Sequence, residues 1–99
     1  MTTDSDNVPQ NTIVKLLDVL HPGVKVYLFG SRARGVHVAS ADIDLALDIG
    51  RKMTIDERAI ARAVLEGLYL PWKIDIVDVR SVTEHLRDTI AREGILWKK

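Results

Sequence analysis

The chain has 99 residues, of which 46% are hydrophobic and 28% charged, so its composition is that of one soluble globular domain rather than a disordered, collagenous or membrane protein. Its 14 Lys and Arg residues balance 14 Asp and Glu residues, and this zero net charge gives no reason to expect non-specific binding to nucleic acid or to an anionic membrane surface. The absence of cysteine excludes disulfides and thiolate metal sites.

Residues 1–10 are predicted to form a flexible polar tail, and residues 11–99 to form the domain. The tail has no basic region followed by an apolar run, so it does not resemble a signal peptide. No stretch is apolar for long enough to span a bilayer. These features favour a cytoplasmic protein.

The first half of the domain reads as helix, strand, turn and strand. Apolar residues at spacings of three and four predict a helix from Asn11 to a stop at residues 21–23. A β-branched and aromatic run at 24–29 predicts a strand that leads directly into Gly30. After a turn, apolar and polar residues alternate over 42–49, which predicts a second strand with one apolar face.

The second half reads as helix, strand, helix and a short edge strand. A capping box at 54–57 opens a helix whose predicted apolar stripe includes Ile55 and Ile60. A third strand is predicted at 73–79, and a second capping box at 81–84 opens a helix that runs to Glu93. Residues 95–97 add an edge strand. The predicted fold class is α+β, with a small mixed sheet and helices packed on one face.

Two carboxylates mark the second strand as a candidate metal site. Asp42 and Asp44 are two residues apart, so they project to the same side with Cα atoms roughly 6.5 Å apart. Like charges held so close favour a cation between them, and hard oxygen ligands suit Mg²⁺. The alternative is the solvated face of an ordinary strand, which is also how we interpret Asp48, too far along to share the metal.

A glycine and a serine stand where the first strand ends. Gly30 would let backbone amides approach a ligand closely, and Ser31 adds a hydroxyl donor, so together they predict a phosphate cradle. The residues of a P-loop are absent. Asp75 adds a third carboxylate within an apolar strand, where an unpaired charge is costly, whereas Asp78 projects to the opposite face. If the strands of Asp75 and Asp44 are neighbours, the carboxylates converge.

These motifs resemble the minimal nucleotidyltransferases of the DNA polymerase β superfamily. The resemblance rests on Gly-Ser at 30–31, the gap to Asp-x-Asp at 42–44, and the strand 73–77, and it implies the polymerase-beta-like palm fold. Ala41 departs from the family, which often has Ser before the first aspartate.

The resemblance also implies roles for individual residues. Asp42 and Asp44 would hold two Mg²⁺ ions, and Asp75 would complete the metal site and help to activate the attacking hydroxyl. The nucleotide, which we expect to be ATP, would be bound through its phosphates by residues of the turn that follows the first predicted strand. These phosphate-binding candidates are Gly30, Ser31, Arg32 and Arg34.

By the same resemblance, the acceptor is expected on a helical partner protein. The partner would be a HEPN-type ribonuclease toxin that receives AMP, so that this chain is the antitoxin, or a substrate-binding subunit that presents a small molecule. A different class of function stays open, a module that neutralises its partner by contact alone. The sequence does not decide whether the chain also forms a homo-oligomer.

Overall fold

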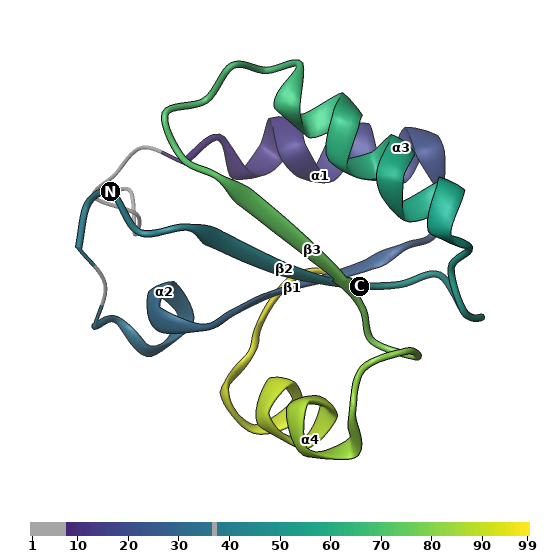
Figure 1. The fold of residues 1–99 in the computed structure, drawn as a ribbon. Helices are drawn as coiled ribbons and strands as arrows, with labels where there is room; N and C mark the ends of the chain where they lie inside the picture. The colour runs from purple at the N-terminus through teal and green to yellow at the C-terminus, as the bar shows by residue number, and fades with distance from the viewer. Residues whose placement is uncertain (1–7, 37) are drawn as a thin grey trace.

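Helices and strands alternate along most of the chain in the computed structural model, which describes residues 8–36 and 38–99 (Figure 1). Their order is α1 (Gln10–Leu20), β1 (Lys25–Phe29), α2 (Ser31–Arg34), β2 (Ile43–Asp48), α3 (Ile55–Glu66), β3 (Ile74–Asp78), α4 (Glu84–Glu93) and β4 (Ile95–Lys98). The predicted order of elements is confirmed, including the short final strand.

The four strands form one mixed sheet in the order β3-β2-β1-β4. β1 is antiparallel to both β2 and β4, while β2 and β3 are parallel. A parallel pair needs a crossover connection, and α3 provides it between β2 and β3. This arrangement makes β2 and β3 start at the same edge of the sheet, which is where the candidate carboxylates lie.

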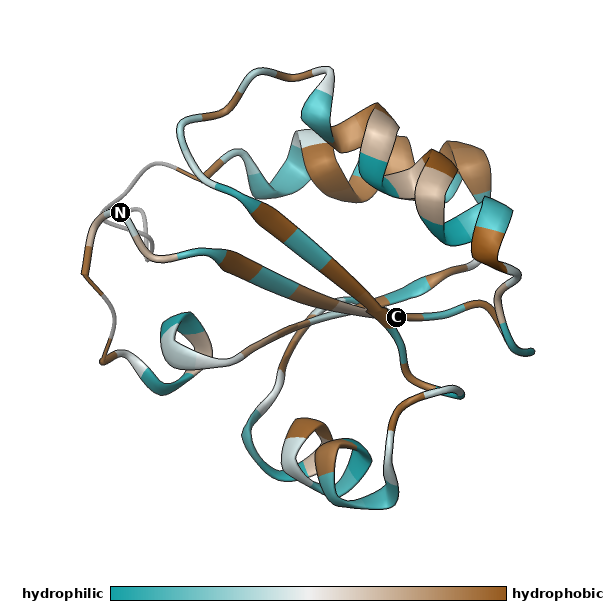
Figure 2. Cartoon of the chain, in the orientation of Figure 1, coloured by the Kyte–Doolittle hydropathy of each residue, from teal (hydrophilic) through white to brown (hydrophobic). Residues whose placement is uncertain are grey.

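The hydrophobic core lies between one face of the sheet and helices α1 and α3 (Figure 1). Alternate residues of the strands point into it, and Figure 2 shows the resulting alternation of hydrophobic and hydrophilic positions along β3. Its fully buried large side chains are Ile13, Leu17, Val24, Val26, Ile43, Leu45, Leu47 and Leu65. The predicted α+β class with a small mixed sheet is therefore confirmed.

The opposite face of the sheet is partly covered. Helix α4 lies on this side, away from α1 and α3 (Figure 1), and contacts β1. Its Ile90 is 4% exposed, and the sheet residue Ala46 is fully buried. The predicted packing of helices on one face therefore holds for α1 and α3 but not for α4, and the candidate carboxylates lie on the part of the second face that α4 leaves uncovered.

Two local predictions need correction. The buried residues of α3 are Ala61 and Leu65, whereas Ile55 is 78% and Ile60 52% exposed, so the helix is rotated from the predicted stripe. Helix α4 is capped by Thr83, three residues from Leu86, and not by a box that begins at Ser81. Ser81 instead donates its hydroxyl to the buried Asp78, which draws it out of the helix.

The N-terminal prediction is only partly covered by the structure. Residues 1–7 of the predicted tail lie outside the described residues. Val8 is 9% exposed and packs with the core, and α1 begins at Gln10. Within the described part of the chain, no helix has the length and apolarity needed to cross a membrane.

Candidate active site

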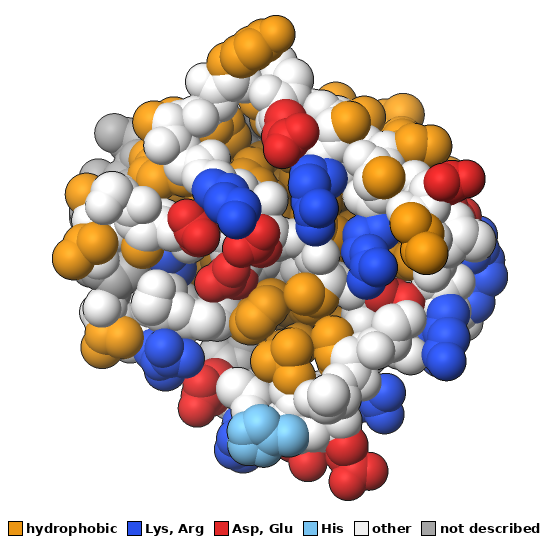
Figure 3. Space-filling model, viewed as in Figure 1, with side chains coloured by type: hydrophobic (Ala, Val, Ile, Leu, Met, Phe, Trp, Pro, Cys, Tyr) orange, Lys and Arg blue, Asp and Glu red, His pale blue; other side chains and the backbone are white. Residues whose placement is uncertain are grey.

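The parallel pairing of β2 and β3 brings two of the predicted carboxylates together. Asp44 is the direct register partner of Asp75, and neighbouring strands lie about 4.8 Å apart. Asp42 is exposed and precedes β2 by one residue, on the same edge of the sheet. Figure 3 shows the molecular surface from the same side as Figure 1. Acidic side chains gather near the middle of the face that it shows, with Lys and Arg side chains beside them.

Gly30 lies against Asp44 at the end of β1. The preceding residue, Phe29, is the last residue of β1 and pairs directly with Asp44 across the antiparallel ladder. A Cβ atom at Gly30 would collide with the Asp44 carboxylate oxygen. The φ and ψ angles of Gly30, 77° and −157°, also belong to a region that other residues rarely adopt. Only glycine therefore lets this turn pass so close to the carboxylate, and Ser31 follows as the first residue of α2.

The pKa of Asp44 reflects its position beside the carboxylates of Asp42 and Asp75. Burial raises the pKa of the Asp44 carboxyl, and the negative charges of Asp75 and Asp42 raise it further, while Arg32 and Arg34 oppose the rise. Burial and like charges both disfavour the ionised form of an acid. A bound cation would relieve both effects, which is the condition expected of a metal-binding carboxylate.

The donor set fits a divalent cation in its chemistry, because carboxylate oxygens are the ligands that such ions prefer, but the side chains are not gathered around one point. Among the described residues, no three His, Cys, Asp or Glu side chains converge closely enough to hold a metal ion. Asp75 is turned toward Lys73, with Oδ1 and Nζ 3.8 Å apart, and the Lys73 side chain is 71% exposed. Such an exposed pair contributes little stability, so Asp75 can exchange Lys73 for a cation at low cost.

The two candidate phosphate-binding arginines are placed differently. Arg34 is half-exposed and forms an ion pair with Glu93 of α4 at 3.5 Å. Arg32 is only 6% exposed, and its guanidinium donates to the carbonyl oxygens of Ala39 and Ala41. Both charges act on Asp44, but only Arg34 presents its guanidinium to solvent.

Trp72 belongs to this region although sequence reasoning did not single it out as a functional residue. Its indole Nε1 donates to the Ala39 carbonyl at 2.8 Å, and its ring lies 5.4 Å from the Arg32 guanidinium carbon. The contact joins residues 33 positions apart. No local pattern encodes such a contact, so periodicity could not reveal it.

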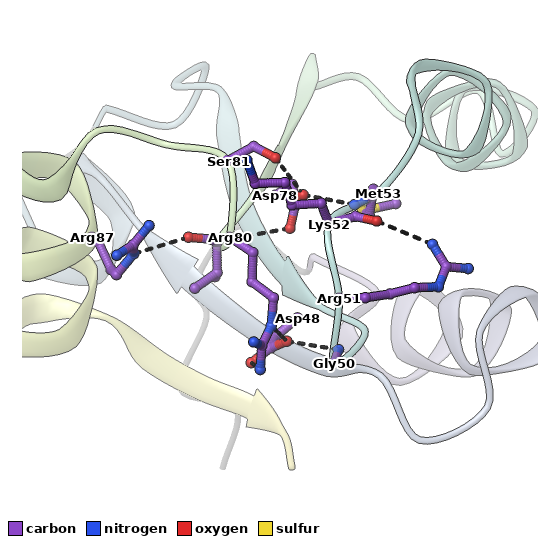
Figure 4. A network of polar contacts seen from close by, with 10 residues as sticks. Asp48, Gly50, Arg51, Lys52, Met53, Asp78, Arg80, Ser81 and Arg87 are labelled. Atoms are coloured by element: carbon purple, nitrogen blue, oxygen red, sulfur yellow. Dashed lines mark hydrogen bonds and ion pairs between the residues drawn. The ribbon is translucent and has the colours of Figure 1, made fainter.

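At the far end of β2 and β3, the other two aspartates have structural roles (Figure 4). Asp78 is buried at 1% exposure and accepts hydrogen bonds from the Met53 and Arg80 amides and the Ser81 hydroxyl. Burial raises the pKa of Asp78, but these hydrogen bonds outweigh it and the net shift is downward. Asp78 thus lies on the core side, as predicted.

Asp48 differs from its prediction as a merely solvated residue. Its carboxylate accepts a hydrogen bond from the Arg80 guanidinium at 2.8 Å, and another from the Gly50 amide. The Arg80 contact is the main reason why the pKa of Asp48 is lowered. Asp48 and Asp44 thus share a strand and a face but have opposite pKa shifts.

Comparison with known proteins identifies the family. Residues 11–98 match the family described as "Polymerase beta, Nucleotidyltransferase". The "Probable protein adenylyltransferase MntA" of Haemophilus influenzae (strain ATCC 51907 / DSM 11121 / KW20 / Rd) is 31% identical over 81 residues, which is 81% of this chain and 71% of the relative.

Solved structures agree with this match. One is described as a toxin-antitoxin with AMP-PNP and has a TM-score of 0.80 at 27% identity, over 92% of this chain and 73% of that one. Another holds a tri-AMPylated Shewanella oneidensis HEPN toxin in complex with its MNT antitoxin, with a TM-score of 0.74 at 26% identity, over 94% and 71% of the two chains. The chain therefore belongs to the polymerase beta nucleotidyltransferase family, within which it is a minimal nucleotidyltransferase similar to MntA.

Proposed function

We propose that this nucleotidyltransferase transfers AMP from ATP to a partner protein, and that it acts as the antitoxin of a HEPN/MNT pair. The observation that carries the proposal is the placement of Asp44 beside Asp75 and against the Gly30 turn. The choice of AMP and of a protein acceptor is supported by the similarity to a protein adenylyltransferase and to a complex that contains an AMPylated HEPN toxin.

In this proposal, the three carboxylates hold Mg²⁺. Asp42 and Asp44 supply oxygen ligands to two ions, and Asp75 completes the set after it leaves Lys73. When bound, the metal ions would neutralise charge on the reacting phosphate and align the attacking and leaving oxygens. Asp75, which lies beside Asp44 and is partly exposed, helps to activate the acceptor hydroxyl.

The phosphate-binding residues complete the site. The Gly30-Ser31 turn and the exposed guanidinium of Arg34 hold the triphosphate next to Asp44. The acceptor hydroxyl gives its proton to Asp75 as its oxygen forms a bond to the α-phosphorus, the bond from that phosphorus to the oxygen that bridges to the β-phosphorus breaks, and pyrophosphate leaves. Positioning and charge neutralisation are most of what this reaction requires from a protein.

The test uses the full chain with a HEPN-type partner protein, labelled ATP and Mg²⁺, followed by mass spectrometry of the partner. We expect the mass of one or more AMP groups on the partner, lost in Asp44→Asn and retained in Asp48→Asn, which changes an aspartate of the same strand outside the site. If Asp44→Asn protects against the toxin as well as the unchanged chain does, the protein acts by contact alone. Label on a small molecule instead of the partner would identify the substrate-binding-subunit alternative.

A further inference from the structure

Arg32 is the most deeply buried cationic residue in the described part of the chain, and three of its hydrogen bonds are directed at the main chain. The side chain is 6% exposed. Its Nε and Nη2 donate to the Ala41 carbonyl at 3.1 and 2.9 Å, and Nη2 also donates to the Ala39 carbonyl at 3.1 Å. Burying a guanidinium is costly unless such bonds are made. Here the bonds fix the Arg32 side chain to the backbone of Ala39 and Ala41.

The segment held in this way is the one that presents Asp42. Asp42 lies outside the ladder of β2, so strand pairing alone does not fix its backbone. The Ala41 carbonyl that Arg32 binds belongs to the preceding residue, and the following residue, Ile43, donates its amide to the Lys73 carbonyl at 2.9 Å. The backbone on either side of Asp42 is therefore fixed, by Arg32 before it and by Lys73, the residue that precedes β3, after it.

Trp72 supports the same segment from a second direction. Its Nε1 binds the Ala39 carbonyl at 2.8 Å, and its ring lies 5.4 Å from the Arg32 guanidinium carbon, within the range of a cation–π contact. Trp72 directly precedes Lys73, whose carbonyl receives the Ile43 amide. The Arg32–Trp72 clamp, as we call these two side chains, thus links α2, the loop before β2 and the start of β3.

We propose that Arg32 is a positioning residue that fixes Asp42 next to Asp44 for cation binding, and not a direct ligand of the nucleotide phosphates. The proposal deepens the proposed function and rests on it. Its physical basis is the planar fork of the guanidinium, which can satisfy two carbonyls at once and stack on an indole ring. Lysine keeps the charge but carries its three N–H donors on one compact ammonium group, so Arg32→Lys removes the planar fork and keeps the charge.

The test compares Arg32→Lys and Trp72→Phe with Arg62→Lys, a control on the exposed surface of α3. Mn²⁺ binding is measured by electron paramagnetic resonance in the presence of AMP-PNP, and AMP-PNP binding is measured separately in EDTA. We expect Arg32→Lys to weaken Mn²⁺ binding by about ten- to a hundredfold, the usual effect of losing a residue that supports a metal ligand, with AMP-PNP affinity in EDTA within about twofold. Trp72→Phe keeps a ring but loses the Ala39 bond, so it should shift Mn²⁺ affinity in the same direction by less.

Hydrogen exchange in the metal-free protein tests the clamp even if the unchanged chain binds no Mn²⁺, a result that would count against the proposed function alone. The Ala41 and Ile43 amides, bonded to Val38 and Lys73, should exchange several times faster in Arg32→Lys while amides of α3 stay unchanged. If Arg32→Lys does not fold, Trp72→Phe carries the same comparison. The proposal is overturned if these amides are unaffected, or if AMP-PNP affinity in EDTA falls tenfold while Mn²⁺ affinity is kept, which would make Arg32 a phosphate ligand.

Discussion

At the scale of single residues, the ionised carboxylate of Asp44 destabilises the folded state of the metal-free protein. Its folded-state pKa is raised by burial and by the charges of Asp75 and Asp42. A raised pKa means that the folded state favours the neutral form of the Asp44 carboxyl. The stability that this neutral form contributes is complete below the unfolded pKa of about 3.9 and is lost as pH rises through the folded pKa. At pH 7 the ionised carboxylate is therefore a cost that a bound cation would offset.

We expect Asp44→Asn to stabilise the metal-free protein at pH 7, because it removes the charge and keeps the shape. A gain of about 0.5 kcal/mol would raise Tm by about 2–4 °C, measured by circular dichroism in EDTA. Asp48→Asn is the matched control and should lower Tm, since the pKa of Asp48 is lowered by Arg80 and its charge is useful. A fall in Tm for Asp44→Asn as large as that for Asp48→Asn would contradict the assignment.

Gly30 provides a second prediction at this scale. Gly30→Ala adds a Cβ that collides with the Asp44 carboxylate at a positive φ, so we expect a loss of about 2–3 kcal/mol of unfolding free energy together with loss of AMP transfer. Gly35→Ala is the control, because Gly35 also has a positive φ but nothing lies within 4 Å of its added Cβ. It should lose only about 1 kcal/mol in urea denaturation. Equal losses for the two variants would show that the Asp44 contact is unimportant.

At the scale of elements, Asp78 joins the ends of two strands to the segments that follow them. It binds the Met53 amide before α3 and the Arg80 amide and Ser81 hydroxyl before α4 (Figure 4). Asp78→Ala would leave buried donors unsatisfied and should cost about 2–3 kcal/mol, or roughly 10–20 °C in Tm. Asp48→Ala, which breaks a partly exposed ion pair to Arg80, should cost less than about 1 kcal/mol. Equal costs would show that burial of Asp78 is not what matters.

Elements were predictable where their signals are local. The capping box at Thr54 can be predicted from the sequence because both of its hydrogen bonds join residues three apart. The start of α4 cannot be predicted in the same way, because Ser81 donates its hydroxyl to Asp78, which also accepts from the Met53 amide 25 residues away along the chain. Likewise the stripe of α3 depends on how the helix packs against β3, which hydrophobic spacing alone does not determine.

At the scale of the whole molecule, the two faces of the sheet divide stability from chemistry. One face carries the core beneath α1 and α3, and the other face, on which α4 lies, carries Asp44 and Asp75. The juxtaposition of these carboxylates could be predicted only on the condition that β2 and β3 are neighbours, a pairing that joins residues 31 apart, Asp44 and Asp75. The Arg32–Trp72 clamp could not be predicted, because it needs the packed arrangement of three separate segments.

The proposed function requires this edge of the sheet to bind a divalent cation together with a nucleoside triphosphate. Paramagnetic broadening of backbone amide NMR signals by MnCl₂ with AMP-PNP tests it directly. We expect broadening that is strongest at Gly30, Asp44 and Asp75 and decreases along the same strands toward Asp48 and Asp78, with no localised effect in Asp44→Asn. Broadening centred elsewhere, or unchanged in Asp44→Asn, would contradict the account.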